Sequence, residues 1–177
     1  MNARCTIVTV IAGAAMLAGC AGAMQPRGPT ALARLEPTRG NAAAGTAAFE
    51  QHGDVVTVHA KVEGLKPGQE HGFHIHDKGD CSSGDGMSTG GHFNPGGRPH
   101  GSPQSAEHHA GDLPALKADG NGLAEVTFEV KGVSIGSGAT DIVGRGLIVH
   151  AMPDDYHTQP TGNSGARIAC GVIARMP

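Results

Sequence analysis

The chain has no tryptophan, and aromatic residues make up only 3% of its 177 residues. Large rings can therefore make up only a small part of the core, and aliphatic and small side chains must fill most of it. Basic residues are not in excess, because 13 lysines and arginines stand against 16 acidic residues. A net charge of −3 excludes the broad basic surface that nucleic-acid binding requires, so nucleic acid is not an expected partner. Glycine, in contrast, is abundant at 29 residues, which indicates many turns.

Long helical patterns are also scarce. Short runs of alternating apolar and polar residues, separated by turns rich in Gly and Pro, predict an all-β sandwich or barrel. The clearest run is 54–63, in which every second residue from Val56 to Val62 is apolar. Further strands are expected at 31–36, 45–51, 70–76, 123–129, 146–151 and 167–174. Segment 77–120 lacks a convincing strand pattern, and loops of that length in a compact domain are usually functional.

The first residues have the composition of a targeting segment. Arg4 precedes an apolar run, 7–17, that is too short and too rich in small residues to span a membrane. The sequence L-A-G-C at 17–20 resembles the lipobox of bacterial lipoproteins, which implies cleavage before Cys20 and attachment of lipid to its thiol. An ordinary secretory signal that is cut elsewhere is the alternative.

We therefore expect a lipoprotein signal peptide at 1–19, a flexible tether at 20–30 that starts with the lipidated Cys20, and one domain at 31–177. The protein would be exported, periplasmic and anchored by its lipid to the bacterial cell envelope. Ala21 stands where inner-membrane lipoproteins of enteric bacteria carry aspartate, so the outer membrane is favoured as the anchoring membrane.

The four cysteines fit this compartment. Cys5 leaves with the signal peptide and Cys20 carries the lipid, so Cys81 and Cys170 remain in an oxidising environment. A disulfide between them is favoured. It would close a loop of about 90 residues, which corresponds to about 4–5 kcal/mol in the chain-entropy model. Two buried free thiols or two thiolate ligands are the alternatives.

Three histidines lie in the predicted strand 70–76. His74 and His76 are two residues apart, and residues i and i+2 of a strand point to the same face. Both imidazoles can therefore reach one metal ion, while Ile75 between them would face the core. On its own this spacing is a weak signal. For His71 we expect a structural hydrogen bond instead.

A second group of metal-ligating residues lies within 21 residues of the predicted loop. It contains His92, His100, His109 and Asp112. Three imidazoles and one carboxylate form a donor set for a closed tetrahedral zinc site. His108 is a competing ligand, although counting back three residues from Asp112 selects His109. The alternative is a polar loop that contains histidines and binds no metal.

His150 ends a predicted strand and is far in sequence from the other candidates. A site that uses it depends on the folded protein to bring strands together. Imidazole suits copper as well as zinc, so a copper site with His150 would be a property of the tertiary structure.

Four short motifs follow one another between residues 72 and 171. They are G-F-H-I-H at 72–76, G-H-F-N-P at 91–95, H-A-G-D-L at 109–113 and G-N-S-G-A-R-I-A-C-G at 162–171. Together they resemble copper/zinc superoxide dismutase in its exported bacterial form, over residues 31–173. The resemblance implies an eight-stranded antiparallel Greek-key barrel or sandwich, with long metal-binding and channel loops.

The resemblance also implies a role for individual residues. The implied copper ligands are His74, His76, His92 and His150. The implied zinc ligands are His92, His100, His109 and Asp112, so His92 would bridge both ions. Cys81 and Cys170 match the disulfide pair of the family. The remaining matches are Arg167, the active-site arginine; Thr161, which lines the channel; and Asp154, which links His74 to His100.

The activity that the resemblance implies is conversion of superoxide to O2 and H2O2 at a cycling copper ion. His92 would pass a proton to the product, and Arg167 would bind the small anionic substrate. Such an enzyme would protect the cell envelope from superoxide. A carrier or buffer of copper and zinc on the same fold, without turnover, is the alternative, and it would have no need of Arg167. The sequence leaves open whether the protein is a monomer or a homodimer.

Overall fold

A computed structural model describes residues 28–177. The expected signal peptide, the lipidated Cys20 and most of the tether lie outside the described residues. Within 28–177 the chain consists of strands and loops, with a single 3-10 turn, η1, at Met87–Thr89. No helix in this part of the chain is long and apolar enough to cross a membrane.

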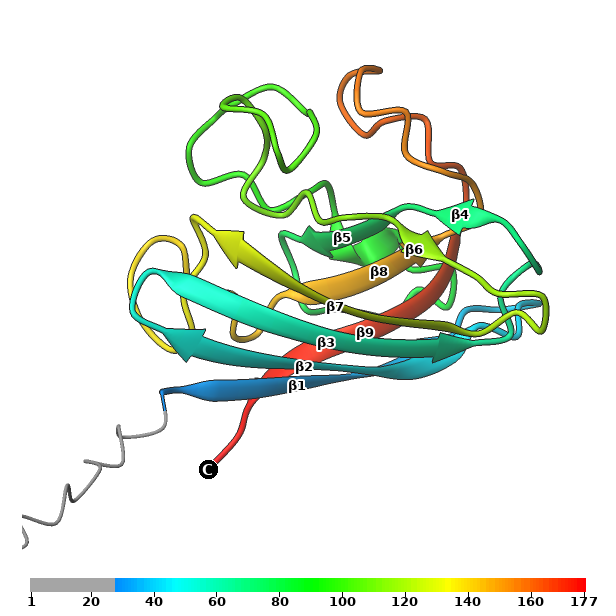
Figure 1. Cartoon of the computed structure of the whole chain (residues 1–177), viewed down its shortest axis with the longest axis horizontal. Helices are drawn as coiled ribbons and strands as arrows, with labels where there is room; N and C mark the ends of the chain where they lie inside the picture. The colour runs from blue at the N-terminus through cyan, green and yellow to red at the C-terminus, as the bar shows by residue number, and fades with distance from the viewer. Residues whose placement is uncertain (1–27) are drawn as a thin grey trace, which may run out of the picture.

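Nine strands form the fold of residues 28–177 (Figure 1). They are β1 (Thr30–Pro37), β2 (Ala44–His52), β3 (Val55–Glu63), β4 (Glu70–His71), β5 (Phe73–His76), β6 (Leu116–Lys117), β7 (Ala124–Lys131), β8 (Gly146–His150) and β9 (Arg167–Arg175). Seven of them make one antiparallel sheet in the order β5-β8-β9-β1-β2-β3-β7, and β4 pairs with β6 beside it. The large sheet curls into a half-barrel, which confirms the predicted all-β antiparallel fold.

The alternation in the sequence decides which face of the sheet is buried. In β3 the apolar residues from Val56 to Val62 are at most 2% exposed, and the residues between them are more exposed. Three of the four phenylalanines, Phe49, Phe73 and Phe93, are also at most 2% exposed and anchor the core inside the curl. Burial of each such side chain contributes about 1.5–3 kcal/mol.

The predicted strand 70–76 is divided at Gly72. The residues before it form β4, which pairs with β6, and the residues after it form β5, which pairs with β8. Gly72 donates its N–H to the carbonyl of Met152 and accepts from the N–H of His150. A Cβ at this position would overlap the side chain of Ser164, so only glycine allows this close approach. With β4 and β5 counted as one interrupted strand, the strands number eight, as expected.

The candidate ligands on β5 lie on the outside of the curl. Phe73 and Ile75 belong to the core, and His74 and His76 alternate with them on the opposite face. Isolated bridges pair His74 with Asp112 and His76 with His92, so the long loop after β5 folds back along this strand.

Two long loops, 77–115 and 151–166, cover that outer face and project at the top of Figure 1. The two ends of the described chain lie together at the opposite side of the barrel, where the N–H of Met176 donates to the carbonyl of Thr30 at 2.9 Å. Both ends of the described chain therefore lie away from the two long loops.

Candidate metal centre

Four histidines from three separate parts of the chain converge beside β5. His74 and His76 come from β5, His92 from the following loop and His150 from the end of β8. One ring nitrogen of each lies within 4.8 Å of the others, and all four residues are buried. The structure thus brings together the four residues that the sequence analysis assigns to copper.

In each of these rings one nitrogen is held and the other is without a partner. His74 Nε2 bonds to Asp154 at 2.7 Å, His76 Nδ1 donates to the carbonyl of Gly90 at 2.9 Å, and His150 Nδ1 donates to the carbonyl of Gly165 at 3.2 Å. The other nitrogen of each ring is buried and has no hydrogen-bond partner among the described residues. These atoms are His74 Nδ1 and the Nε2 atoms of His76, His92 and His150.

A buried nitrogen without a partner is costly, at about 1–3 kcal/mol each. Four of them directed into one cluster are therefore hard to explain as ordinary packing. Imidazole nitrogens are good ligands for copper, and their remaining N–H groups are held by carbonyl and carboxylate oxygens, as is usual around metal sites. The donor set of this cluster fits a copper ion.

A second cluster joins His92, His100, His109 and Asp112, all of them buried. The Nδ1 atoms of the three histidines lie 2.8, 3.1 and 3.3 Å from one oxygen, Asp112 Oδ1. Neighbouring ligands around tetrahedral zinc are about 3.3–3.4 Å apart, given bonds of about 2.0–2.1 Å. Three nitrogens around one carboxylate oxygen at these spacings fit a zinc ion.

His92 belongs to both clusters through opposite edges of its ring. Its Nδ1 faces Asp112 at 2.8 Å, and its Nε2 is the atom that lies among the other three histidines of the first cluster. The ring centroids of His92 and His74 are only 4.0 Å apart. One imidazole ring therefore connects the two candidate sites.

Asp154 connects the clusters a second time, behind the ligands. Its Oδ2 accepts from His74 Nε2 at 2.7 Å, and its Oδ1 accepts from His100 Nε2 at 2.9 Å. Gly162 lies directly against this pair with a φ of 65°, and a Cβ there would overlap Asp154 Oδ1. The structure thus places Asp154 between one residue of each cluster, in the position that the sequence analysis assigns to it.

The electrostatics of the two clusters differ when no metal is bound. Burial, together with neighbouring histidines, lowers the pKa of His76 and His150 well below 6.5. Burial likewise lowers the pKa of His92 to about 4. His100 is also buried, but its hydrogen bonds to Asp112 and Asp154 outweigh that effect and raise its pKa to about 9.

The two carboxyl groups beside these rings belong to Asp112, in the second cluster, and to Asp154, behind both clusters. Burial alone would raise the pKa of Asp112 and Asp154, but hydrogen bonds from the surrounding histidines overcome it and hold both pKa values far below 3.8. Both groups are therefore carboxylates at neutral pH, which is the state that binds or supports a cation.

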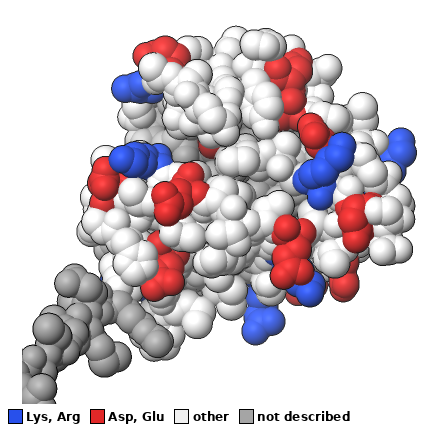
Figure 2. All heavy atoms as spheres, in the orientation of Figure 1, with Lys and Arg blue, Asp and Glu red and all other residues white. Residues whose placement is uncertain are grey.

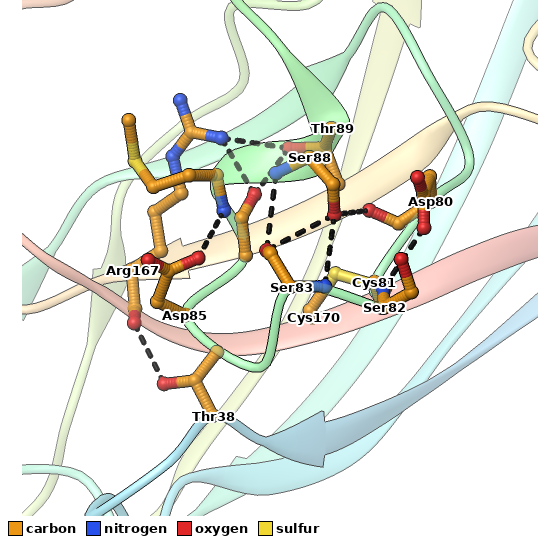
Figure 3. Close-up of a disulfide and its surroundings, with 12 residues drawn as sticks. Thr38, Asp80, Cys81, Ser82, Ser83, Asp85, Ser88, Thr89, Arg167 and Cys170 are labelled. Carbon is orange, nitrogen blue, oxygen red and sulfur yellow. Dashed lines mark hydrogen bonds between the residues drawn. A yellow bond between two sulfur atoms is a disulfide. The ribbon is translucent and has the colours of Figure 1, made fainter.

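Arg167 lies at the edge of the first cluster, opposite His150 in the β8–β9 pairing. Its Nη1 donates to the carbonyl of Gly86 at 2.7 Å and to Thr89 Oγ1 at 2.8 Å, and its Nη2 donates to the carbonyl of Gly90 at 2.7 Å. Figure 3 shows the guanidinium reaching from β9 to Thr89 at the short helix. The side chain is half-buried and held as a fixed cation.

The loop that holds Arg167 is itself fixed by a disulfide. Cys81 and Cys170 are bonded, which confirms the predicted pairing, and their Cα atoms are 5.9 Å apart (Figure 3). Cys170 lies on β9 three residues after Arg167, so the bond ties the segment that supplies the acceptors of Arg167 to the strand that carries it.

Comparison with known proteins agrees with this arrangement. Residues 43–173 match the family described as copper/zinc superoxide dismutase (SODC). This chain belongs to the copper/zinc superoxide dismutase family. A crystal structure of a double mutant of a SOD-like protein from Bacillus subtilis is similar, with a TM-score of 0.72 and 38% sequence identity over 81% of this chain and 96% of that one.

Members of this family normally bind copper and zinc, and the two clusters described above could hold such ions. The relative is named SOD-like, so the match shows family and fold rather than activity. Thr161 is half-buried beside Gly162, and its role in lining a channel stays a prediction. The hydrogen bond expected for His71 is confirmed, since its Nδ1 donates to the carbonyl of His150 at 2.8 Å.

Some supporting residues were not found from the sequence. The side-chain amide of Gln159 accepts from the N–H of His100 and donates to its carbonyl, both at 2.9 Å, and so fastens one loop to the other. Gly86 and Gly90 act through their carbonyl groups, which every residue type possesses. No residue type or spacing in the sequence could have singled out these contacts.

Proposed function

We propose that this protein is an active copper/zinc superoxide dismutase, which converts two superoxide ions and two protons into O2 and H2O2. The observation that carries the proposal is a single ring, His92, with one nitrogen in each of two buried clusters. Copper in the first cluster would supply one-electron redox chemistry, and zinc in the second would supply a fixed charge without redox activity.

Arg167 is the residue that we assign to binding superoxide. Its three hydrogen bonds to the loop fix the guanidinium beside the first cluster and leave it positively charged. On the face in Figure 2 acidic and basic side chains are interspersed. The attraction for a small anion is therefore best explained by this local cation rather than by the net charge of −3.

His92 is the residue that we assign to proton transfer. Its Nδ1 is directed at Asp112, so Nε2 is the ring atom that can hold or release a proton at the first cluster. Burial keeps the pKa of this ring near 4 without metals, so the metal-free ring is neutral at physiological pH and its single proton lies on Nδ1, toward Asp112. Zinc held in the second cluster would take the place of that proton and leave Nε2 as the nitrogen that can carry one.

The proposal is tested by superoxide decay with protein whose copper and zinc content has been measured. We expect rapid decay by the protein that holds both metals. His150→Ala should abolish it and spare zinc, because His150 belongs to the first cluster alone. Asp112→Ala should instead lower zinc content. His59→Ala, an exposed residue of β3, is the control and should change neither metal nor rate.

Two results would contradict the proposal in different ways. If protein that holds both metals has no activity, the alternative function, a carrier or buffer of copper and zinc, is favoured. The similar structure is named SOD-like, so it is compatible with that alternative. Equal loss of the same metal in His150→Ala and Asp112→Ala would show that the two clusters are not separate sites.

We also propose that the protein is exported and carries lipid on Cys20. The Cys81–Cys170 disulfide supports export, since such bonds persist mainly in oxidising compartments. Incorporation of labelled fatty acid into the protein, and its loss in Cys20→Ser, is the expected result. Labelling that survives this substitution would overturn the assignment of Cys20.

A further inference from the structure

Asp154 can join the two clusters only while both of its oxygens stay in place. Its Oδ1 accepts from His100 Nε2, and its Oδ2 accepts from His74 Nε2. A rotation of the carboxylate would misalign both bonds, and hydrogen bonds weaken steeply when their angle departs from linear. A group that fixes the orientation of this carboxylate therefore contributes to both clusters at once.

Tyr156 makes a third bond to the same carboxylate. Its backbone N–H donates to Asp154 Oδ1 at 2.7 Å, so this oxygen accepts from Tyr156 and from His100 together. Tyr156 has a φ of 58°, in the left-handed region, which is strained for a residue with a bulky side chain. Contacts elsewhere must therefore hold the backbone of Tyr156 in this conformation.

The ring of Tyr156 makes such a contact. Its phenolic oxygen accepts from the backbone N–H of Ala115 at 3.2 Å, and the residue is half-buried. Ala115 directly precedes β6 and lies three residues after Asp112 of the second cluster. At a φ of 58° the N–H of Tyr156 faces Asp154 while the ring reaches Ala115. The ring thus fastens the loop 151–166 to the loop that carries the second cluster.

The turn that follows Tyr156 is held by bonds of its own. Asp155 Oδ1 accepts from the N–H groups of His157 and Thr158 at 2.9 and 2.8 Å. The N–H of Gly162 donates to the carbonyl of Thr158 at 2.7 Å. None of these bonds uses the Tyr156 side chain, so a substitution there should leave this turn folded.

We propose that Tyr156 is the positioning residue for Asp154. The ring, held at Ala115, fixes the backbone of Tyr156, and its N–H in turn fixes the carboxylate between His74 and His100. This inference rests on the two metal sites of the proposed function but not on turnover. It assigns the only tyrosine of the chain to the support of both metals.

The experiment measures the affinity of metal-stripped, full-length protein for copper and for zinc by competition with chelators. Tyr156→Ala removes the ring and leaves a strained backbone without its contact, so we expect both affinities to fall about tenfold, as on loss of groups that support metal ligands. Tyr156→Gly also lacks the ring, but glycine adopts a positive φ without strain. It should recover part of both affinities, which a role of the ring in packing alone would not allow.

A double substitution shows whether Tyr156 acts through Asp154. In Asp154→Asn protein, Tyr156→Ala should lower neither affinity further, because the pair of oxygens that Tyr156 orients is already lost. His157→Ala is the matched control, since His157 is the next residue of the same turn and is exposed. It should change neither affinity.

Three results would overturn the role of Tyr156. They are unchanged affinities in Tyr156→Ala, equal losses in Tyr156→Ala and Tyr156→Gly, and a full further loss when Tyr156→Ala is added to Asp154→Asn. In each case unsubstituted protein that binds both metals and removes superoxide would leave the proposed function intact. Unsubstituted protein that binds neither metal would overturn the metal sites and this inference with them.

Discussion

His76 and Arg167 donate hydrogen bonds to the same carbonyl oxygen, that of Gly90, at 2.9 Å from Nδ1 and 2.7 Å from Nη2. A residue of the first cluster and the nearby cation are therefore positioned by one peptide group. That group belongs to the loop that the disulfide ties to β9. Movement of this loop would displace both side chains together.

Replacement of Arg167 tests its role in binding the anion. Arg167→Ala should leave copper and zinc content unchanged, because no atom of Arg167 belongs to either cluster. Loss of a hydrogen bond to a charged group, about 1.5–3 kcal/mol, would slow superoxide decay by about ten- to hundredfold. Arg167→Lys should recover part of the rate, since it keeps the charge. Arg34→Ala, an exposed arginine of β1, serves as the control.

Asp154 offers a test of the link between the clusters. In Asp154→Asn one oxygen is replaced by an NH2 group, so the side chain can no longer accept from both His74 and His100. Affinity for copper and for zinc should both fall, by about 10- to 100-fold, as competition with chelators would measure. The exposed neighbour Asp155→Asn should leave both affinities intact. A loss confined to one metal would contradict the bridging role.

The metal-free protein should be most stable near pH 6.5. The folded-state pKa of His76, His92 and His150 lies below 6.5, so between about pH 4 and 6.5 the unfolded chain binds more protons and stability rises with pH. The pKa of His100 is raised to about 9, so its contribution is complete below pH 6.5 and is lost as pH rises to about 9.

The measurement for this pH dependence is the urea midpoint of metal-stripped protein at several pH values. The acid side should be steeper, because three rings act there against one on the alkaline side. His100→Gln should remove the decline above pH 6.5 and keep the decline below it. A midpoint that rises steadily from pH 7 to 9 in the unsubstituted protein would contradict the role of His100.

Loss of the disulfide should reduce both stability and activity. Cys81 and Cys170 are 89 residues apart, and opening such a loop corresponds to about 4–5 kcal/mol in the chain-entropy model. Cys170→Ser should therefore unfold at lower urea concentration. At a temperature where it is still folded and loaded with both metals, its superoxide decay should also be slower, because the segment that holds Arg167 is no longer tied to β9. Full activity in that state would show that Arg167 does not need the disulfide-tied loop for its function.

The features of the fold and the site that could be predicted are those set by residues close together in the sequence. The alternation from Val56 to Val62 is a local property of a strand, so it indicates the buried face before any tertiary contact is known. The same alternation puts His74 and His76 on one face. The second cluster lies within a single loop segment, which explains why its donor set could be recognised from spacing.

Other features of the site depend on strand pairing and on backbone groups, and only the tertiary structure shows them. His150 reaches the first cluster only because β8 pairs with β5, and that pairing joins residues 70 or more positions apart. The carbonyl of Gly90, which holds His76 and Arg167, carries no signature in residue type, since every peptide has a carbonyl. By itself the sequence determined the ligand types and the strand faces; the folded chain decided that one ring, His92, stands between the two clusters.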